Sequence, residues 1–296
     1  MLAAVTQPRT TFIAGPVGRL AVHEWPADTS AQNAAPTLLA HPTGFHGRIW
    51  APVAERLVAA GRRVWSLDFR GHGDSDAPDP AGDDYSWDGF ASDALAVVDH
   101  LGVAGDPTLL VCGHSKGGAA LLLGEERRPG TFPRIWAYEP IVFPTEFANM
   151  DADEFPMARS ARKRRIEWSS VEEAYEVYAS KPPLDVMTPE SLRAYVEYGL
   201  RDRGDGVFEL KCRPEVEARV FSMAPGNGVW DALPDIGSNV VVACGESSRS
   251  IAPALAQDIA LRLQHARVEV WPGCGHFGPQ EAPDLCAESI LALARD

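Results

Sequence analysis

LLVCGHSKGGAALLL, residues 109–123, is the stretch that decides the fold. Its first four residues form an apolar run that predicts a short buried strand. The glycines and alanines at 117–120, followed by three leucines, predict the tightly packed start of a helix. Between strand and helix stands Ser115 in a G-x-S-x-G pattern, which indicates a sharp, strained turn that exposes the serine hydroxyl at the top of a sheet. The sequence therefore predicts that Ser115 is a nucleophile and that the backbone N–H of Lys116 points toward a developing oxyanion.

Strands and helices alternate on both sides of this stretch. Apolar runs predict strands at 18–25, 37–40, 63–68, 109–112, 135–138, 239–244 and 266–271. Helical spacing of apolar residues, with capping residues and glycines at the ends, predicts helices at 50–60, 86–101, 253–263 and 281–295. Such alternation is typical of an α/β protein with a mostly parallel sheet and helices on both faces.

The alternation stops between residues 141 and 235, where we find no convincing buried strand. Helical stretches are expected there at 159–168, at 170–179 and from Thr188 onward. Residues 141–235 are therefore predicted to form a helical cap, and residues 1–140 and 236–296 the core. The aromatic residues of the cap are expected either to line an apolar pocket or to pack the cap onto the sheet: Trp168, Tyr175, Tyr178, Tyr195, Tyr198 and Trp230.

The composition of the chain indicates which kinds of partner and which cellular compartment to expect. The chain has 296 residues with 41 acidic and 27 basic side chains, and its net charge of −14 argues against nucleic acid and anionic membranes as partners. Five scattered cysteines without a C-x-x-C pair indicate reduced thiols. The N-terminal residues do not resemble a signal peptide, and no apolar run is long enough for a transmembrane helix. We expect a cytoplasmic protein and leave homodimer formation open.

Four landmarks together resemble a known family. They are HPTG at 41–44, DFRGHGDS at 68–75, the turn around Ser115, and Gly275-His276 near the end. Their types, order and spacing resemble the α/β-hydrolase superfamily, and within it the capped serine hydrolases of the esterase and lipase type. The resemblance covers nearly the whole chain and implies an eight-stranded, mostly parallel sheet. Related haloalkane dehalogenases and epoxide hydrolases have Asp at the turn, so a serine implies acyl chemistry instead.

The resemblance also implies roles for individual residues. The family places its histidine in a loop after the last strand, which makes His276 the base that activates the serine. The second oxyanion donor of the family comes from the loop after the third strand, two residues past a histidine, which is Thr43 here. Pro42 has no N–H, but that position is not the usual donor.

The acidic partner of the histidine is left open at this point. The family usually has G-x-x-D after the seventh strand, whereas residues 245–248 read GESS, so Ser248 occupies the position of the acid. Serine cannot stabilise an imidazolium as a carboxylate does. Glu139, at the end of the sixth strand, is our first candidate, because some dehalogenases carry their acid there. Glu246 is the alternative, and a missing acid is the third possibility.

These residues lead to a functional hypothesis with two alternatives. The first hypothesis is a serine hydrolase that cleaves a small, apolar carboxylic ester or lactone through an acyl-enzyme intermediate. The alternatives are hydrolysis of a C–C bond in a vinylogous diketone and a non-catalytic ligand-binding protein on the same fold. No cofactor is expected, and no set of Cys, His, Asp and Glu has metal-ligand spacing. The basic run at 159–165 is interpreted as a solvated helix face, with attraction of an anionic substrate as the alternative.

Overall fold

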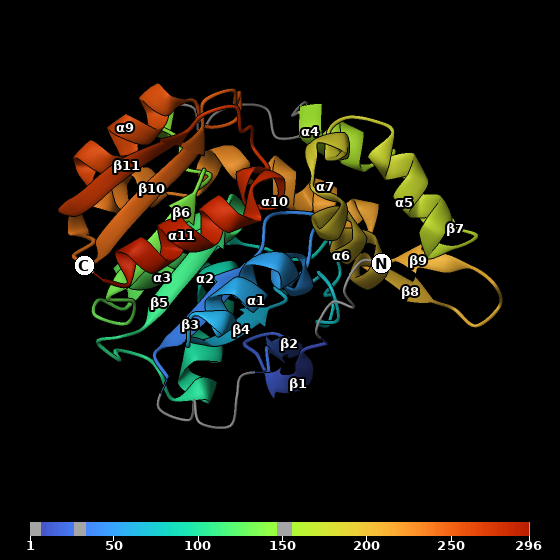
Figure 1. The fold of residues 1–296 in the computed structure, drawn as a ribbon, viewed down its shortest axis with the longest axis horizontal. Helices are drawn as coiled ribbons and strands as arrows, with labels where there is room; N and C mark the ends of the chain where they lie inside the picture. Colours follow the sequence, from blue (N-terminus) through green and yellow to red (C-terminus); the bar gives the residue numbers. More distant parts are fainter. Residues whose placement is uncertain (1–6, 27–33, 147–155, 296) are drawn as a thin grey trace.

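An eight-stranded sheet forms the centre of the molecule (Figure 1). The computed structural model describes residues 7–26, 34–146 and 156–295. Along the sheet the strands stand in the order β1-β2-β4-β3-β5-β6-β10-β11. Neighbours from β4 to β11 are parallel, whereas β1 pairs with β2, and β2 with β4, in antiparallel fashion. The strands are β1 (Arg9–Ala14), β2 (Arg19–Glu24), β3 (Pro36–Ala40), β4 (Arg63–Leu67), β5 (Leu110–His114), β6 (Arg134–Tyr138), β10 (Asn239–Gly245) and β11 (His265–Trp271).

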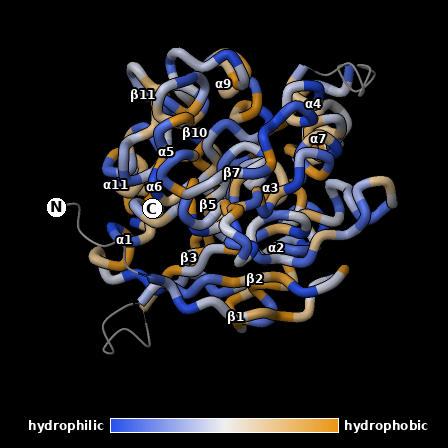
Figure 2. Tube along the Cα trace, turned by 90° about the vertical axis from the view of Figure 1, so that its right-hand side faces the viewer, coloured by the Kyte–Doolittle hydropathy of each residue, from blue (hydrophilic) through white to orange (hydrophobic). Residues whose placement is uncertain are grey.

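The central strands explain why the apolar runs of the sequence predict the sheet. Every residue of β3 and β5 is buried, as expected for parallel strands covered on both faces. The trace in Figure 2, coloured by hydropathy, has orange, hydrophobic stretches at these two strands. The edge strand β1 is different because most of its residues are exposed. It therefore has no continuous apolar run, and the sequence pattern did not locate it.

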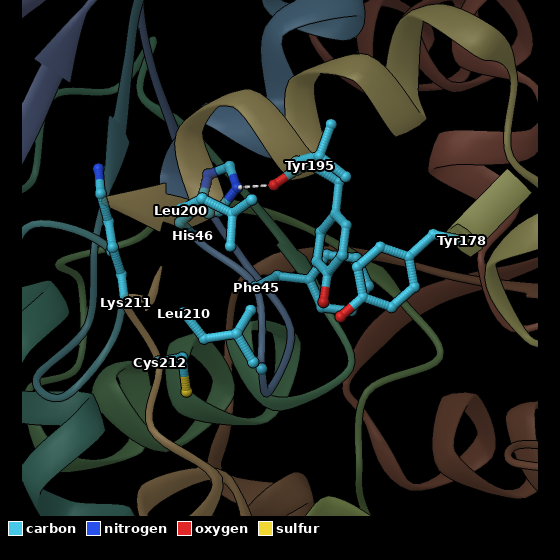
Figure 3. A pocket seen from close by; sticks show the side chains of 12 residues that line it. Phe45, His46, Tyr178, Tyr195, Leu200, Leu210, Lys211 and Cys212 are labelled. Carbon is cyan, nitrogen blue, oxygen red and sulfur yellow. Dashed lines mark hydrogen bonds between the residues drawn. The ribbon is translucent and has the colours of Figure 1, made fainter. Parts of the chain in front are cut away.

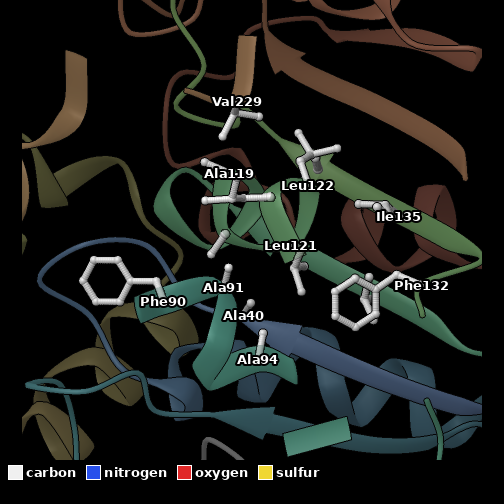
Figure 4. Close-up of a cluster of buried hydrophobic side chains, with 14 of the residues drawn as sticks. Ala40, Phe90, Ala91, Ala94, Ala119, Leu121, Leu122, Phe132, Ile135 and Val229 are labelled. Atoms are coloured by element: carbon white, nitrogen blue, oxygen red, sulfur yellow. The ribbon is translucent and has the colours of Figure 1, made fainter. Parts of the chain in front are cut away.

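Helices cover both faces of the sheet. On one face, α2, α3 and α9 enclose a hydrophobic cluster in which Ala91 and Ala119 allow close packing and Leu121 and Leu122 fill the space (Figure 4). On the other face, α1 and α11 contact each other and enclose a second cluster around Trp50. The α/β architecture with helices on both faces is thus confirmed. The core helices are α1 (Ala51–Ala59), α2 (Trp87–Leu101), α3 (Lys116–Arg127), α9 (Pro253–Arg262), α10 (Gly278–Glu281) and α11 (Pro283–Leu293).

Most of the α-helices in the described part of the segment between β6 and β10 lie at one end of the molecule (Figure 1). These helices are α4 (Pro156–Ala161), α5 (Val171–Ala179), α6 (Pro189–Gly199), α7 (Pro214–Ser222) and α8 (Val229–Ala232). Short 3-10 helices are η2 (Gly47–Trp50) in the core, and η4 (Leu184–Val186), η5 (Ala224–Gly226) and η6 (Leu233–Asp235) in this segment. The limits of the cap, 141 and 235, stay a prediction.

One expectation for the cap was wrong, and short strands occur beside its helices. The helix expected at 159–168 ends already at Ala161, and the same segment contains strands. A three-stranded antiparallel sheet, in the order β7-β9-β8, is formed by β7 (Glu167–Trp168), β8 (Leu200–Asp202) and β9 (Phe208–Leu210). The strands are too short for a periodic pattern, and tertiary contacts of Arg164 and Trp168 with distant residues override the helical tendency of this stretch. No helix in the described part of the chain is long and apolar enough to cross a membrane.

Candidate active site

Ser115 occupies a strained turn between β5 and α3. Its backbone has φ 55° and ψ −116°, and among the described residues other than glycine only Ser115 and Glu139 have a positive φ. Such conformations cost on the order of 1–3 kcal/mol and persist where the surrounding structure enforces them, often at functional sites. Gly117 makes the turn possible, because a Cβ at this position would collide with the backbone oxygen of Ala40 on the neighbouring strand.

The second strained residue, Glu139, contacts His276. Glu139 Oε2 lies 2.6 Å from His276 Nδ1, and the glutamate side chain is completely buried. Ser248 Oγ donates to Oε2 at 2.7 Å, and the backbone N–H of Gly245 donates to Oε1 at 3.0 Å. Because all three partners can donate, they stabilise the charged carboxylate. An ionised carboxylate only accepts, so the proton of the imidazole lies on Nδ1 and Nε2 is free to act as a base.

Neither Ser248 nor Glu246 is the acidic partner of His276 in this arrangement. Ser248, at the position where the family usually has its acid, is a hydrogen-bond donor to Glu139. Glu246 is exposed, and its carboxylate accepts the backbone N–H of Gly273 at 3.2 Å. The structure thus brings Glu139 to the histidine and leaves Glu246 outside this cluster.

Two residues not identified from the sequence hold the histidine loop. Tyr138 Oη donates to the backbone oxygen of Gly275 at 2.7 Å. The Glu281 carboxylate accepts the N–H groups of Gly275 and Phe277, at 3.0 and 3.1 Å, on either side of His276. Burial raises the pKa of Glu281, although these two N–H donors oppose the shift. In the sequence, Glu281 stands out only because it lies in the helix that follows His276. The residue pattern of this helix does not indicate that Glu281 contacts the histidine loop.

The two expected oxyanion donors lie next to the same cavity. Lys116 is the first residue of α3, so its backbone N–H has no acceptor within the helix. Thr43 is buried and lines the cavity together with Ser115 and His276. His41 supports this loop, because its Nε2 accepts the backbone N–H of Phe69 at 3.1 Å. No hydrogen bond joins Ser115 to His276 in the described part of the chain, which is common for such a pair when no substrate is bound.

The cavity at Ser115 has a volume of about 690 Å³ and a largely apolar lining. Helices α7 and α9, the loop after β6, and α4 supply most of its walls. The apolar lining side chains include Trp87, Ile141, Phe143, Met157, Val220, Phe221, Ala224, Ala254 and Leu255. Arg249 and Asp258 are its charged residues. A largely apolar cavity with a few polar groups is typical of a site for a small organic ligand.

Comparison with known proteins establishes the family. Residues 37–289 match the model of the alpha/beta hydrolase family, well over half of the chain. The chain belongs to the alpha/beta hydrolase family. The predicted eight-stranded, mostly parallel sheet of this family is confirmed.

Three similar proteins show how far the likeness extends. A monoacylglycerol lipase of Mycolicibacterium smegmatis is 34% identical over 128 residues, which are 42% of this chain and 43% of the lipase. The chain therefore matches less than half the length of this relative. The crystal structure of E-2-(acetamidomethylene)succinate hydrolase has a TM-score of 0.81 at 19% identity and covers 98% of this chain and 100% of its own. The enol-lactonase of Burkholderia xenovorans has a TM-score of 0.71 at 18% identity, with coverages of 97% and 100%.

In this alpha/beta hydrolase the six tryptophan and tyrosine residues named in the sequence analysis do not line the cavity at Ser115, although Phe143 and Phe221 do. Trp168 packs on Tyr178 with ring centroids 5.2 Å apart, and Tyr178 packs on Tyr195 at 5.6 Å. Tyr178 and Tyr195 instead border a second, much smaller cavity of about 10 Å³, together with Phe45 and Cys212 (Figure 3). This volume holds about one water molecule.

The Lys116 side chain points away from the cavity into the core of the hydrolase. Its ammonium group lies 4.4 Å from the ring centroid of Phe69 and 4.7 Å from that of Phe90. His72 Nε2 is 3.4 Å away and can accept from it, because His72 Nδ1 donates to the backbone oxygen of Arg70. Burial lowers the pKa of Lys116 to about 7.

One group of side chains in the described residues has the spacing of metal ligands, namely His23, Asp68 and Asp74. Its ligand atoms already have partners. Asp68 Oδ2 accepts from His23 Nε2 at 3.0 Å and from the backbone N–H of Asp74 at 2.7 Å. Asp74 also pairs with Lys211 at 2.6 Å and with Arg48 at 3.2 Å. Two cations beside the carboxylates oppose a metal ion here, so we interpret the group as a structural network.

Proposed function

We propose that this alpha/beta hydrolase is a serine hydrolase that cleaves a carboxylic ester or lactone through an acyl-enzyme intermediate. The observation that carries the proposal is the placement of three groups from distant parts of the chain. Ser115 in its strained turn and His276, which is paired with the buried Glu139, face one apolar cavity. A nucleophile, a base and a group that orients the base are the parts that activated-serine chemistry needs.

Each step follows from the atoms at the site. Ser115 Oγ attacks the carbonyl carbon while His276 Nε2 takes its proton, and Glu139 stabilises the imidazolium. The backbone N–H groups of Lys116 and Thr43 donate hydrogen bonds to the carbonyl oxygen as it becomes negatively charged. The imidazolium then gives its proton to the leaving alkoxide. Water, deprotonated by the same histidine, attacks the acyl-enzyme, and the imidazolium returns this proton to Ser115 Oγ as the carboxylic acid is released.

The cavity supports an apolar substrate. Its lining offers few groups that could bind a strongly polar ligand, and burial of apolar surface drives binding in such sites. The similarity to a monoacylglycerol lipase and to an enol-lactonase is in keeping with an ester or lactone bond. The serine in place of an acid at position 248 favours the alternative of a non-catalytic protein, whereas the contact between Glu139 and His276 supports the enzyme.

The direct test is the Ser115→Ala variant on a short-chain aryl ester. The wild type should show burst kinetics and stoichiometric labelling by a fluorophosphonate, whereas Ser115→Ala should lose turnover and labelling, because the acyl-enzyme cannot form. Ser247→Ala, an exposed serine near the site, is the matched control and should behave as the wild type. Wild-type turnover by Ser115→Ala would refute the proposal. A panel with aryl esters, lactones and ring-cleavage diketones separates ester or lactone hydrolysis from C–C bond cleavage.

A further inference from the structure

Arg164 belongs to the basic run of the cap, but its side chain is turned inward. Nη1 lies 2.5 Å from Glu217 Oε2, and Nη2 lies 2.6 Å from Tyr195 Oη and 3.2 Å from Tyr178 Oη. Figure 3 shows the two tyrosine rings next to each other beside Phe45. The interpretation of 159–165 as a solvated helix face is therefore wrong for Arg164, which joins the loop after α4 to α5, α6 and α7.

Glu217, the partner of Arg164, contacts the loop that carries Thr43. A Cβ built on Gly44 would lie 2.8 Å from Glu217 Cδ and 3.3 Å from Cγ, so the carboxyl group touches the Gly44 backbone directly. Gly44 also has φ +79°, which a side chain would disfavour. A nearly buried carboxylate thus packs against the residue that follows the proposed oxyanion donor.

A carboxylate in this place has an electrostatic consequence for the reaction. The transition state develops negative charge next to Thr43, and an uncompensated negative group nearby in a poorly hydrated region raises the barrier. Arg164 is the cation that faces Glu217, from the loop after α4. Tyr195 and the Cys212 thiol also interact with the carboxylate, and burial raises the pKa of both, so both stay neutral. The charge of Glu217 is thus cancelled by Arg164 alone among these groups.

We propose that Arg164 is a positioning residue of the hydrolase, which holds Glu217 against Gly44 and neutralises its charge beside the oxyanion site at Thr43. The proposal rests on the proposed function, because it assumes that Thr43 donates to an oxyanion. This role can be distinguished from a purely structural role of the ion pair. If the pair only anchors the cap, removing either partner should lower kcat equally. If Arg164 cancels the charge of Glu217, removing the cation should lower kcat, whereas removing the anion should not.

The test compares Arg164→Met, Glu217→Gln and the double variant on a soluble aryl ester. Arg164→Met should lower kcat by about 10- to 100-fold with little change in KM, because the negative charge is left uncompensated next to the oxyanion. Glu217→Gln should keep kcat within about threefold of the wild type or raise it, because the amide still binds Arg164 and the remaining charge is positive. The double variant should recover most of the kcat that Arg164→Met loses.

Rescue by a conservative variant gives a second readout. Arg164→Lys, which keeps the cation, should retain most of kcat.

The outcomes separate this proposal from the proposed function. Equal losses of kcat in Arg164→Met and Glu217→Gln, without recovery in the double variant, would mean that the pair is only an anchor of the cap. Wild-type kcat in Arg164→Met would also overturn the proposal. If Arg164→Met does not fold by circular dichroism, a fall of kcat in Glu217→Gln by more than about tenfold still contradicts it. Turnover that survives Ser115→Ala would instead remove the proposed function itself.

Discussion

Glu139 combines a strained backbone conformation with a buried carboxylate. Its backbone has φ 43°, which is unfavourable for a side chain this large, and its carboxylate is buried. A buried charge is costly unless it is paired and hydrogen-bonded, and here Gly245, Ser248 and His276 supply three donors. The strained backbone aims the carboxylate at those donors, so the conformation and the ionised state support each other.

Replacing Glu139 by Gln tests how much the negative charge of Glu139 contributes to kcat, because the two side chains have nearly the same shape. We expect Glu139→Gln to fold as the wild type but to lower kcat by up to about 10⁴-fold, because the amide stabilises neither the imidazolium nor the Nδ1-protonated tautomer of His276. Steady-state kinetics on an aryl ester measures the effect. Glu246→Gln is the matched control and should change kcat less than about threefold, because Glu246 is exposed and bonded to Gly273. A larger loss in the Glu246 variant than in the Glu139 variant would reverse the assignment of the acid.

At the scale of elements, the backbone and the side chain of Lys116, at the start of α3, have different environments. The backbone N–H of Lys116, next to Ser115, is an expected oxyanion donor, while its side chain packs against α2 and the loop after β4. Burial lowers the pKa of this ammonium from 10.5 to about 7. Between these values the unfolded chain binds a proton that the folded protein does not, so the free energy of unfolding rises with pH in this range. Below about pH 7 the Lys116 side chain is charged in the folded protein too, and the full destabilisation by this buried charge is present.

The Lys116→Met variant should therefore be more stable than the wild type, and most of all at low pH. We expect a gain in the free energy of unfolding of about 1–4 kcal/mol near pH 6, which shrinks as pH rises toward about 10. Urea denaturation at several pH values measures this gain. The backbone N–H remains, so aryl ester turnover should stay within about threefold of the wild type. Lys163→Met, at an exposed position, controls for the loss of surface charge, and a gain independent of pH would contradict the burial of a titrating amine.

At the scale of the whole molecule, the candidate site lies where the sheet ends and the cap begins. The carboxyl ends of β3, β5 and β6 lead directly to Thr43, Ser115 and Glu139, as is usual for ligand sites in open α/β sheets. The walls of the cavity come from α4, α7 and α9, which belong to the cap and to the far part of the core. In the proposed function the sheet supplies the reacting groups, and the covering helices supply the apolar surface that selects a substrate.

This division predicts a dependence on the length of the substrate chain. For a series of aryl esters, kcat/KM should rise about fourfold for each added methylene, the factor that corresponds to ~0.8 kcal/mol per buried CH₂, until the cavity is filled. Ala254→Phe, on the wall formed by α9, should lower kcat/KM for the long esters and leave the acetate ester unchanged. Leu261→Phe, on the same helix but 73% exposed, is the control. A flat dependence on chain length would show that the cavity does not take the substrate.

The amino-acid sequence by itself determined the layered core. Continuous apolar runs give buried parallel strands, and small residues around Ser115 permit the tight turn, because both effects depend on neighbours in the chain. The landmarks at 41–44, 115 and 275–276 could be placed for the same reason, since each follows directly on a strand whose position was predictable. The exposed β1 and the short β7, β8 and β9 were missed, because they have no such local signal.

Tertiary structure alone decided which side chains meet. The choice between Glu139 and Glu246 depends on a positive φ and on donors from β10 and the histidine loop, which no local pattern encodes. The support of that loop by Glu281 and the inward turn of Arg164 toward Glu217 are equally non-local. A pattern reports whether a side chain prefers burial, but the partner of a buried charge comes from wherever the fold brings an opposite charge or a donor, because only pairing offsets its loss of hydration.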